Sequence, residues 1–242
     1  MSLSEPKLTN PATKFIEFKG DSGEFFYYDK LTEQKVQLPM PIYFIVLDEL
    51  SAIKGFNQQL KVGIYSNEVR YIKDEVLNVR SFKGGIQIVG KYQDIKDSAL
   101  REGGKYCKSV YAALVTEGNI ELVNFQFHGA SFSGSSDDKK CLSGWINKKV
   151  NPEQYGIMVK ETEQGKNGVV IFNAPIFEPG WLLSKRPDVF EKAVEMDRVL
   201  QKYLKSYLNA QVEKTTIETT SEETPPTYFM EPADQNENDS TF

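Results

Sequence analysis

The chain has 242 residues, 40% of them hydrophobic, and a formal net charge of −5, which is ordinary for a globular protein that can bury a core. No apolar run reaches the roughly 20 residues of a membrane span, and the first residues, MSLSEPKLTNPATK, lack the apolar segment of a secretory signal. These features argue against a membrane protein or an exported one. We therefore expect a cytoplasmic location, with Cys107 and Cys141 as reduced thiols.

Charge is distributed unevenly along the chain. The last 30 residues contain eight acidic residues and one lysine, which leaves 26 acidic and 28 basic residues in the first 212. The sequence therefore predicts a mildly basic body, of charge about +2, joined to an acidic tail. Such a body can have a polyanionic partner although the whole chain is acidic.

Residues 1–13 are polar and contain two prolines, so we predict a flexible arm. Short runs rich in β-branched and aromatic residues follow, separated by glycine-containing turns, as is typical of β-strands and hairpins. A short helix is expected within Asp94–Gly104. The predicted strands are Lys14–Lys19, Glu24–Asp29, Pro41–Leu47, Asn78–Phe82, Ile86–Tyr92, Tyr106–Val115 and Ile120–His128.

This order of elements favours a mainly β fold. Several short strands with one intervening helix suit an OB-fold-like Greek-key barrel, and a β-sandwich fits nearly as well. Gly156–Glu161 and Gly168–Ala174 predict an added hairpin, and a C-terminal helix is expected from about Arg186 to Gln211. Residues 14–211 would then form one nucleic-acid-binding domain. One face of the helix is apolar, either packing on the barrel or forming a dimer seam; it carries Val189, Ala193, Met196, Leu200, Tyr203 and Tyr207.

From Val212 onward Thr, Glu, Pro, Asn and Asp dominate, so we predict a disordered acidic tail over residues 212–242. Its end combines a terminal ring with nearby acids, a pattern that suits docking into an apolar pocket with a basic rim. The tail can also cover a basic groove of its own chain and compete with phosphates. An ordinary solvated tail is the simpler alternative. The candidate docking residues are Asp234, Glu237, Asp239 and Phe242.

Basic and aromatic residues alternate in several segments of the body. Binding to a single strand of nucleic acid requires cations for the phosphates and rings on which bases stack. Any single ring can instead belong to the core, and in an extended strand Tyr106 and Lys108 lie on one face with Lys105 and Tyr111 on the other. The candidate nucleic-acid-binding residues are Lys54, Phe56, Lys61, Tyr65, Arg70, Tyr71, Lys73, Arg80, Phe82, Lys83, Lys91, Tyr92, Lys105, Tyr106, Lys108 and Tyr111.

The sequence offers little for catalysis. His128 is the one histidine, and its spacing from Cys107 and Cys141 matches no paired zinc-ligand pattern. Phosphate-binding and dinucleotide-binding glycine loops are absent, and the acids of Asp137-Asp138 stand in a Ser/Gly loop without an obvious third. We therefore expect a protein that is not an enzyme and that uses neither a cofactor nor a metal.

Three segments carry a resemblance to single-stranded DNA-binding proteins of bacteriophages, which have an OB-fold and an acidic tail ending in phenylalanine. They are the C-terminal Glu237–Phe242, the stretch Phe15–Asp29 (FIEFKGDSGEFFYYD) and the run Ile53–Arg70. The body resemblance covers roughly the first 130 to 145 residues. It implies sequence-tolerant binding of single-stranded DNA in replication, recombination and repair, within the host cytoplasm, and recruitment of a polymerase, helicase or primase through the tail.

Residues 150–211 exceed a minimal OB-fold, so they are expected to brace the barrel or to form a homodimer. Binding of RNA instead of DNA stays open, because stacking on rings hardly distinguishes the two sugars. The main alternative is a phage structural or adaptor protein that acts through its tail without binding DNA. A metal-dependent nuclease is the second alternative, and the few clustered acids make it the weaker one.

Overall fold

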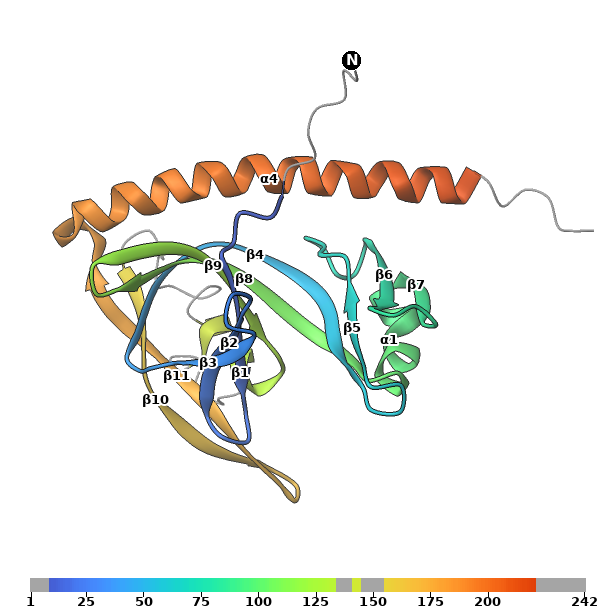
Figure 1. The fold of residues 1–242 in the computed structure, drawn as a ribbon, viewed down its shortest axis with the longest axis horizontal. Coiled ribbons are helices and arrows are strands. Elements are labelled where there is room, and N and C mark those ends of the chain that lie inside the picture. Colours follow the sequence, from blue (N-terminus) through green and yellow to red (C-terminus); the bar gives the residue numbers. More distant parts are fainter. Residues whose placement is uncertain (1–8, 134–140, 145–154, 221–242) are drawn as a thin grey trace, which may run out of the picture.

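The computed structural model describes residues 9–133, 141–144 and 155–220 of the chain. These residues form one large, mixed, 11-stranded sheet with a long C-terminal helix across it (Figure 1). The strands are β1 (Lys14–Lys19), β2 (Glu24–Asp29), β3 (Gln34–Leu38), β4 (Ile42–Asn57), β5 (Val62–Ser66), β6 (Val76–Ser81), β7 (Gln87–Lys91), β8 (Gly104–Thr116), β9 (Asn119–Phe127), β10 (Tyr155–Asn167) and β11 (Val170–Leu182). The helices are α1 (Tyr92–Arg101), α2 (Ala130–Ser133), the 3₁₀ turn η1 (Leu183–Lys185) and α4 (Pro187–Thr220).

The strand order is β3-β2-β1-β9-β8-β4-β5-β6-β7, and β10 pairs with β11 and with β4. Among the described strands β1 and β9 run parallel, and every other neighbouring pair is antiparallel. The mainly β class, the added hairpin and the C-terminal helix are thus confirmed. The sheet is not closed into the predicted barrel, because its outer strands β3 and β7 do not pair with each other.

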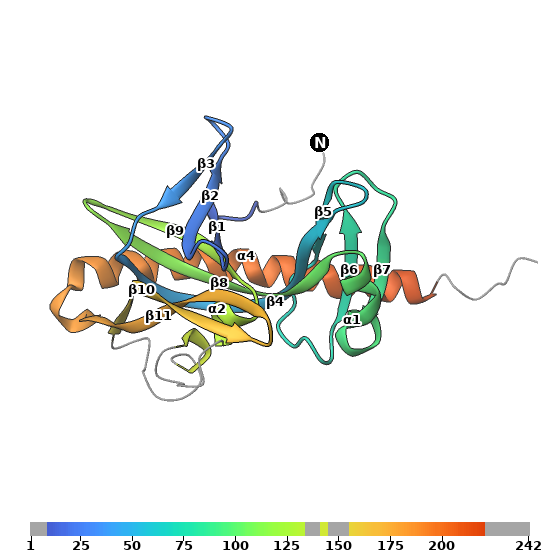
Figure 2. The same ribbon diagram turned by 90° about the horizontal axis from the view of Figure 1, so that it is seen from below.

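Two long strands, β4 and β8, connect two lobes. One edge of β4 pairs with β8 over nearly its whole length. The other edge pairs with β10 at its start, over Ile42–Phe44, and with β5 at its end, over Lys54–Asn57. The first lobe therefore contains β1–β3, β9 and β10–β11, and the second contains β5–β7 and α1. In the view of Figure 2, β1–β3 and β5 lie above the β4–β8 ribbon and β10–β11 lie below it.

Each lobe has its own apolar core. In the first lobe Phe25, Phe44, Phe125 and Phe127 are buried against one another, with Phe25 making edge contacts to Phe125 and Phe127. In the second lobe aliphatic side chains of β4, β5 and β6 pack on one face of α1, which contributes Ile95 and Ala99. One face of the β4–β7 sheet is therefore covered by α1.

The apolar stripe of α4 packs on the sheet, as one of the two alternatives predicted. Val189 and Ala193 lie against Ile45 and Ala113, and Leu200 and Tyr203 lie over Leu50, Tyr111 and Leu122. Burial of this face explains the helix better than propensity alone, since most helical stability in proteins comes from such packing.

The predicted start of the tail at Val212 falls inside α4, whereas the predicted start of the body at Lys14 coincides with the start of β1. The helix α4 continues to Thr220 because the chain has no glycine or proline between Val212 and Pro225 to end it. Residues 221–242, with the docking residues Asp234, Glu237, Asp239 and Phe242, lie outside the described residues. At the other end, Asn10 and Thr13 of the predicted arm bind the sheet at Tyr111 and Leu122, while residues 1–8 lie outside.

The sequence prediction omits two strands, β3 and β5, and it makes β4, β10 and β11 too short. Gln34–Leu38 is an edge strand whose polar and apolar residues do not divide into a clear apolar face and a polar one. Val62–Ser66 is short and contains a glycine. β4 continues past Leu47 to Asn57, through Asp48 and Glu49, at a bulge that follows Val46.

Within the described parts of the chain, none of the helices has the length and apolar character to cross a bilayer.

Candidate nucleic-acid interface

Four predicted residues form a row across the second lobe. Lys105 of β8 pairs with Lys54 of β4, and Lys54 pairs with Tyr65 of β5. Tyr65 in turn pairs with Arg80 of β6. Directly opposite residues of antiparallel strands point to the same side of a sheet, so the four side chains share one face. That face is opposite to the one that buries Ile64 and Val79 against α1.

Exposed aromatic rings lie beside this row. The ring centroid of Phe82 lies 4.7 Å from that of Tyr65. The Phe82 ring also lies over Gly63, where a Cβ atom would come within 2.8 Å of a ring carbon. Phe56 is the cross-strand partner of Gly63. Phe82 is 76% exposed, Phe56 47% and Tyr65 37%, so these rings are open to solvent instead of filling a core. We call these residues the basic–aromatic face: Lys54, Phe56, Tyr65, Arg80, Phe82 and Lys105.

The cations of the basic–aromatic face form no ion pair within the part of the chain that the structure describes. Within the described residues, Lys54, Arg80 and Lys105 form no ion pair with a carboxylate, although five other cations do. Arg80 donates a hydrogen bond to the neutral Asn78, and the Lys54 ammonium lies 5.6 Å from the centroid of the Phe15 ring. Three cations on one face that form no described ion pair can each bind a phosphate.

Three further predicted lysines surround this face. Lys83 follows Phe82 in the β6–β7 turn, and Lys91 pairs with Val76 at the opposite end of β6 and β7. Lys61 stands in the β4–β5 turn, with φ at 51°. All three are exposed. They extend the positive surface beyond the row itself.

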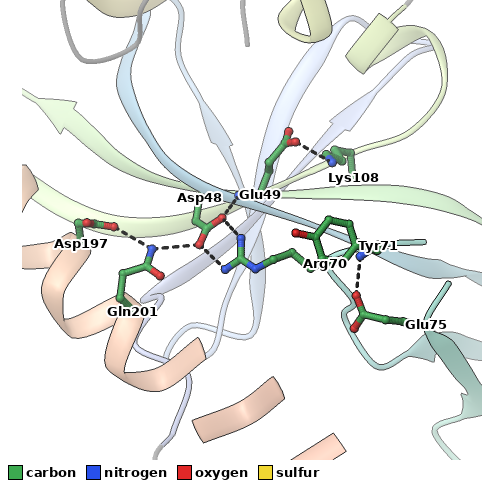
Figure 3. A network of polar contacts seen from close by, with 8 residues as sticks. All are labelled: Asp48, Glu49, Arg70, Tyr71, Glu75, Lys108, Asp197 and Gln201. Atoms are coloured by element: carbon green, nitrogen blue, oxygen red, sulfur yellow. Dashed lines mark hydrogen bonds and ion pairs between the residues drawn. The ribbon is translucent and has the colours of Figure 1, made fainter. Parts of the chain in front are cut away.

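Arg70, by contrast, has a structural partner (Figure 3). Its two terminal nitrogens donate to the two carboxylate oxygens of Asp48, each at 2.8 Å. Gln201 of α4 donates to the same carboxylate at 3.0 Å. The pair therefore fastens the loop between β5 and β6 to β4 and α4. Tyr71 and Lys73 are exposed on this loop, outside the basic–aromatic face.

The prediction for Tyr111 was wrong. Its ring is fully buried, and its hydroxyl donates to Glu68 Oε2 at 2.7 Å. Burial, followed by the proximity of Glu68, raises the pKa of this phenol above its ordinary value. The ring cannot stack a base because α4 covers the middle of β8. Lys105 lies on the same strand face but beyond the reach of this packing, and it stays exposed.

The predicted residues on the other face of β8 also have internal partners. The Tyr106 hydroxyl lies 3.2 Å from Ser51 Oγ, and its ring contacts that of Tyr92, with centroids 5.8 Å apart. Lys108 forms an ion pair with Glu49 at 3.0 Å. These three side chains are half-buried, on the side of the sheet opposite Lys105. The structure therefore does not bring them together with the basic–aromatic face.

A buried polar cluster beneath α4 was not foreseen. Glu68 is buried and accepts hydrogen bonds from the hydroxyls of Ser109 and Tyr111, while its backbone N–H donates to the hydroxyl of Tyr207. The pKa of nearby Tyr203 is raised to about 12, mainly by burial. The cluster joins the β5–β6 loop to β8 and α4, so we assign it a structural role. No local sequence signal marks Glu68, since an acid beside Asn67 suits a solvated loop equally well.

The ion pair between Asp48 and Arg70 predicts a pH-dependent contribution to stability. Burial alone would raise the pKa of Asp48, but hydrogen bonds from Arg70 and Gln201 outweigh it and lower the pKa. Because the folded pKa is the lower one, this stabilisation is present above the unfolded pKa and is lost as the pH falls through the folded pKa. Asp48→Asn should lower the free energy of unfolding by about 1–2 kcal/mol at pH 7, as measured by urea denaturation.

The difference between Asp48→Asn and the wild type should begin to shrink below about pH 4, where the carboxylate of the unfolded chain becomes protonated, and should be lost as the pH falls through the lower pKa of the folded state. Asp188→Asn, which removes an exposed partner of Arg186, is the matched control and should leave the urea midpoint unchanged. A difference between Asp48→Asn and wild type that stays constant from pH 7 to pH 3 would contradict the assignment.

No metal-binding cluster of three His, Cys, Asp or Glu side chains is found in the described part of the chain. Burial lowers the pKa of His128 and raises that of Cys107 to about 12, so Cys107 is a neutral thiol at neutral pH. Comparison with known proteins finds no matching family model, curated protein or solved structure. The function must therefore be argued from the residues of the basic–aromatic face themselves.

Proposed function

We propose that the chain is a non-enzymatic, sequence-tolerant single-stranded DNA-binding protein of the bacteriophage type that its sequence resembles. It would serve replication, recombination and repair in the host cytoplasm. The observation that carries the proposal is the basic–aromatic face, in which cations that form no described ion pair stand in register with exposed rings. Cations and stacking rings in one surface are the two features that single-strand binding needs.

In this proposal each part of the face has a separate role. Lys54, Arg80 and Lys105 bind successive phosphates, and Phe56, Tyr65 and Phe82 offer flat surfaces to the bases. Every base has such a surface, so binding would depend little on sequence. OB-folds bind single strands through the same combination of cations and stacking rings. We propose this combination here on the open face of a sheet. RNA bases would stack on the same rings.

The proposal is tested by the salt dependence of binding. A labelled dT oligonucleotide of about 30–40 nucleotides would be titrated with the protein, with fluorescence anisotropy as the signal. An external label is preferable because Trp181 stacks on Tyr43 in the first lobe, away from the face. For single strands, the logarithm of the binding constant falls linearly with the logarithm of the salt concentration, and each phosphate contact adds about 0.7 to the steepness of this slope. Replacing Lys54, Arg80 and Lys105 together with alanine should therefore reduce the slope by about 2.

The matched control removes three exposed lysines of α4, namely Lys192, Lys202 and Lys205. It carries the same change of net charge, so a general electrostatic effect would appear in both variants. The proposal expects the α4 variant to keep the wild-type slope. Equal slopes for all three proteins would show that the basic–aromatic face is not the path of the DNA.

The acidic tail is proposed to recruit the replication partner and to compete with DNA for the same face. Removing Asp234–Phe242 should therefore tighten dT binding, by about three- to tenfold at low salt, because a competing anionic segment is lost. Binding of the polymerase, helicase or primase should disappear. Phe242→Ala is the control that keeps the charge, and it should lose the partner while leaving dT affinity unchanged. Equal dT affinity of the truncated and intact proteins would remove the competition.

A protein adaptor is the second candidate, and one observation favours it. The tip of the β10–β11 hairpin exposes the consecutive apolar residues Val169, Val170 and Ile171, and apolar surface of this kind often marks a protein contact. The adaptor proposal predicts no saturable dT binding by either the intact or the truncated chain. Binding of dT that depends on the basic–aromatic face would leave the hairpin tip as an accessory contact.

A further inference from the structure

Two exposed aromatic rings lie outside the basic–aromatic face, on β1 and β2. Ile16 pairs with Tyr27, and both turn toward the core of the first lobe. Phe15 precedes Ile16 and Tyr28 follows Tyr27, so their rings point to the opposite side of the sheet. There Tyr28 is 56% exposed and Phe15 37%. The outer side of β1–β2 therefore offers two rings to solvent.

This side of β1–β2 belongs to the same face of the sheet as Lys54 and Tyr65. Glu17, two residues beyond Phe15, pairs with Gln126 of β9, which pairs with Ser109 of β8. Ser109 and Lys105 lie on one side of β8 because they are four positions apart, and side chains alternate along a strand. The Lys54 ammonium over the Phe15 ring connects the two regions directly, and in Figure 2 β1–β3 and β5 extend to the same side of the β4–β8 ribbon.

The β2–β3 pair also repeats the arrangement found at the centre of the basic–aromatic face. Tyr28 pairs with Lys35 of β3, just as Tyr65 pairs with Lys54. Lys35 is exposed, its ammonium lies 4.7 Å from the centroid of the neighbouring Phe26 ring, and it has no ion pair with a described carboxylate. A cation and an open ring thus recur on the same face of the first lobe.

We infer that the first lobe carries a second base-stacking segment for single-stranded DNA, formed by Phe15, Tyr28 and Lys35 and joined to the basic–aromatic face through Lys54. This inference rests on the proposed function and extends it. One strand of DNA crosses from the second lobe to the first, with phosphates on Lys54 and Lys35 and bases on the rings between and beyond them. A short oligonucleotide occupies one segment, and a longer one occupies both.

The experiment compares dT oligonucleotides of about 6 and about 20 nucleotides, within and beyond the site size of one OB-fold. In the wild type, affinity increases with length as the second segment is engaged. The Phe15→Ala/Tyr28→Ala variant is expected to lose at least tenfold of this gain, because two stacking surfaces are missing. Phe190→Ala, which removes a ring of similar exposure from α4, is the matched control and should keep the whole gain.

Tyr28→Ala alone and Lys35→Ala serve as further variants if the double variant unfolds, because both side chains are exposed. Each should lower the affinity for the longer oligonucleotide more than that for the shorter one. If these variants keep the wild-type gain while Tyr65→Ala/Phe82→Ala loses binding, the second segment is refuted and the proposed function stands. If the wild type binds neither oligonucleotide, both proposals are refuted.

Discussion

The Tyr65→Ala/Phe82→Ala variant is expected to bind single-stranded dT about 30-fold more weakly than the wild type, or weaker still. Each stacked base contributes about 1–3 kcal/mol when its ring is removed, and the two rings are in contact. Their loss also removes the surface next to the cross-strand neighbours Lys54 and Arg80. The affinity would be measured by anisotropy at one fixed salt concentration, because phosphate contacts depend strongly on salt.

Tyr71→Ala gives the sharpest comparison for this variant. Tyr71 is 66% exposed, but it lies on the loop fastened by Arg70 and outside the basic–aromatic face. Its removal should change dT affinity by less than about twofold, although Tyr71, like Tyr65, is one of the predicted binding residues. Thermal unfolding of both variants should stay close to that of the wild type, since exposed side chains contribute little to stability. Equal losses of affinity in the two variants would contradict the assignment of the face.

The largest loss of stability is expected for Glu68→Ala. The substitution removes the acceptor of two buried hydroxyls, those of Ser109 and Tyr111, and leaving a buried donor without a partner costs about 1–3 kcal/mol. We expect the free energy of unfolding to fall by about 3–4 kcal/mol, measured by urea denaturation. Glu68→Gln keeps one acceptor oxygen, so it should lose about half as much.

Glu195→Ala is the control for this prediction, because Glu195 is exposed on α4 and its loss should change stability by less than about 0.5 kcal/mol. Below its unfolding temperature, Glu68→Ala should bind dT with wild-type affinity, since the cluster lies beneath α4 and away from the basic–aromatic face. A Glu68→Ala protein as stable as the wild type would show that the cluster is not structural. Loss of dT binding by a folded Glu68→Ala protein would also contradict the account.

Local patterns in the sequence predict several elements of the fold correctly. β1 and β2 have the predicted bounds because alternating apolar residues and the turn at Gly23, with φ at 75°, are local signals. The apolar stripe of α4 is likewise a local pattern in the sequence. The open sheet cannot be predicted from local patterns, because it depends on the parallel pairing of β1 with β9. In this pairing Lys14 lies beside Val123, more than 100 residues away. The length of β4 likewise depends on its partners β10 and β5.

In the candidate site, too, individual residues are predictable from local sequence, but their arrangement is not. Lys54, Tyr65, Arg80 and Lys105 could each be predicted from basic and aromatic neighbours, but their common row depends on the register of four strands. Arg70 beside Tyr71 resembles such a pair locally, and only the distant Asp48 distinguishes it. No local signal separates the buried Tyr111 from the exposed Tyr65 either, because the covering helix α4 lies far along the chain.

Phe15 and Tyr28 were not predicted as binding residues for a related reason. The run Glu24–Asp29 places rings on both faces of one strand, and the sequence does not indicate which face is buried. Packing of Phe25 on Phe125 and Phe127 decides it, and Tyr28 is then left on the open side. The choice depends on contacts with β9, which is distant in sequence.

Photocrosslinking to a dT oligonucleotide that carries iodouracil tests the central claim most directly, because the reaction favours rings stacked on the modified base. The intact protein would be saturated with the oligonucleotide, irradiated and digested, and the crosslinked residues would be identified by mass spectrometry. We expect crosslinks at Phe56, Tyr65 and Phe82. Duplex competitor should not remove these crosslinks, whereas high salt should. Crosslinks confined to α4 or to the β10–β11 hairpin, or no complex with dT at all, would contradict it.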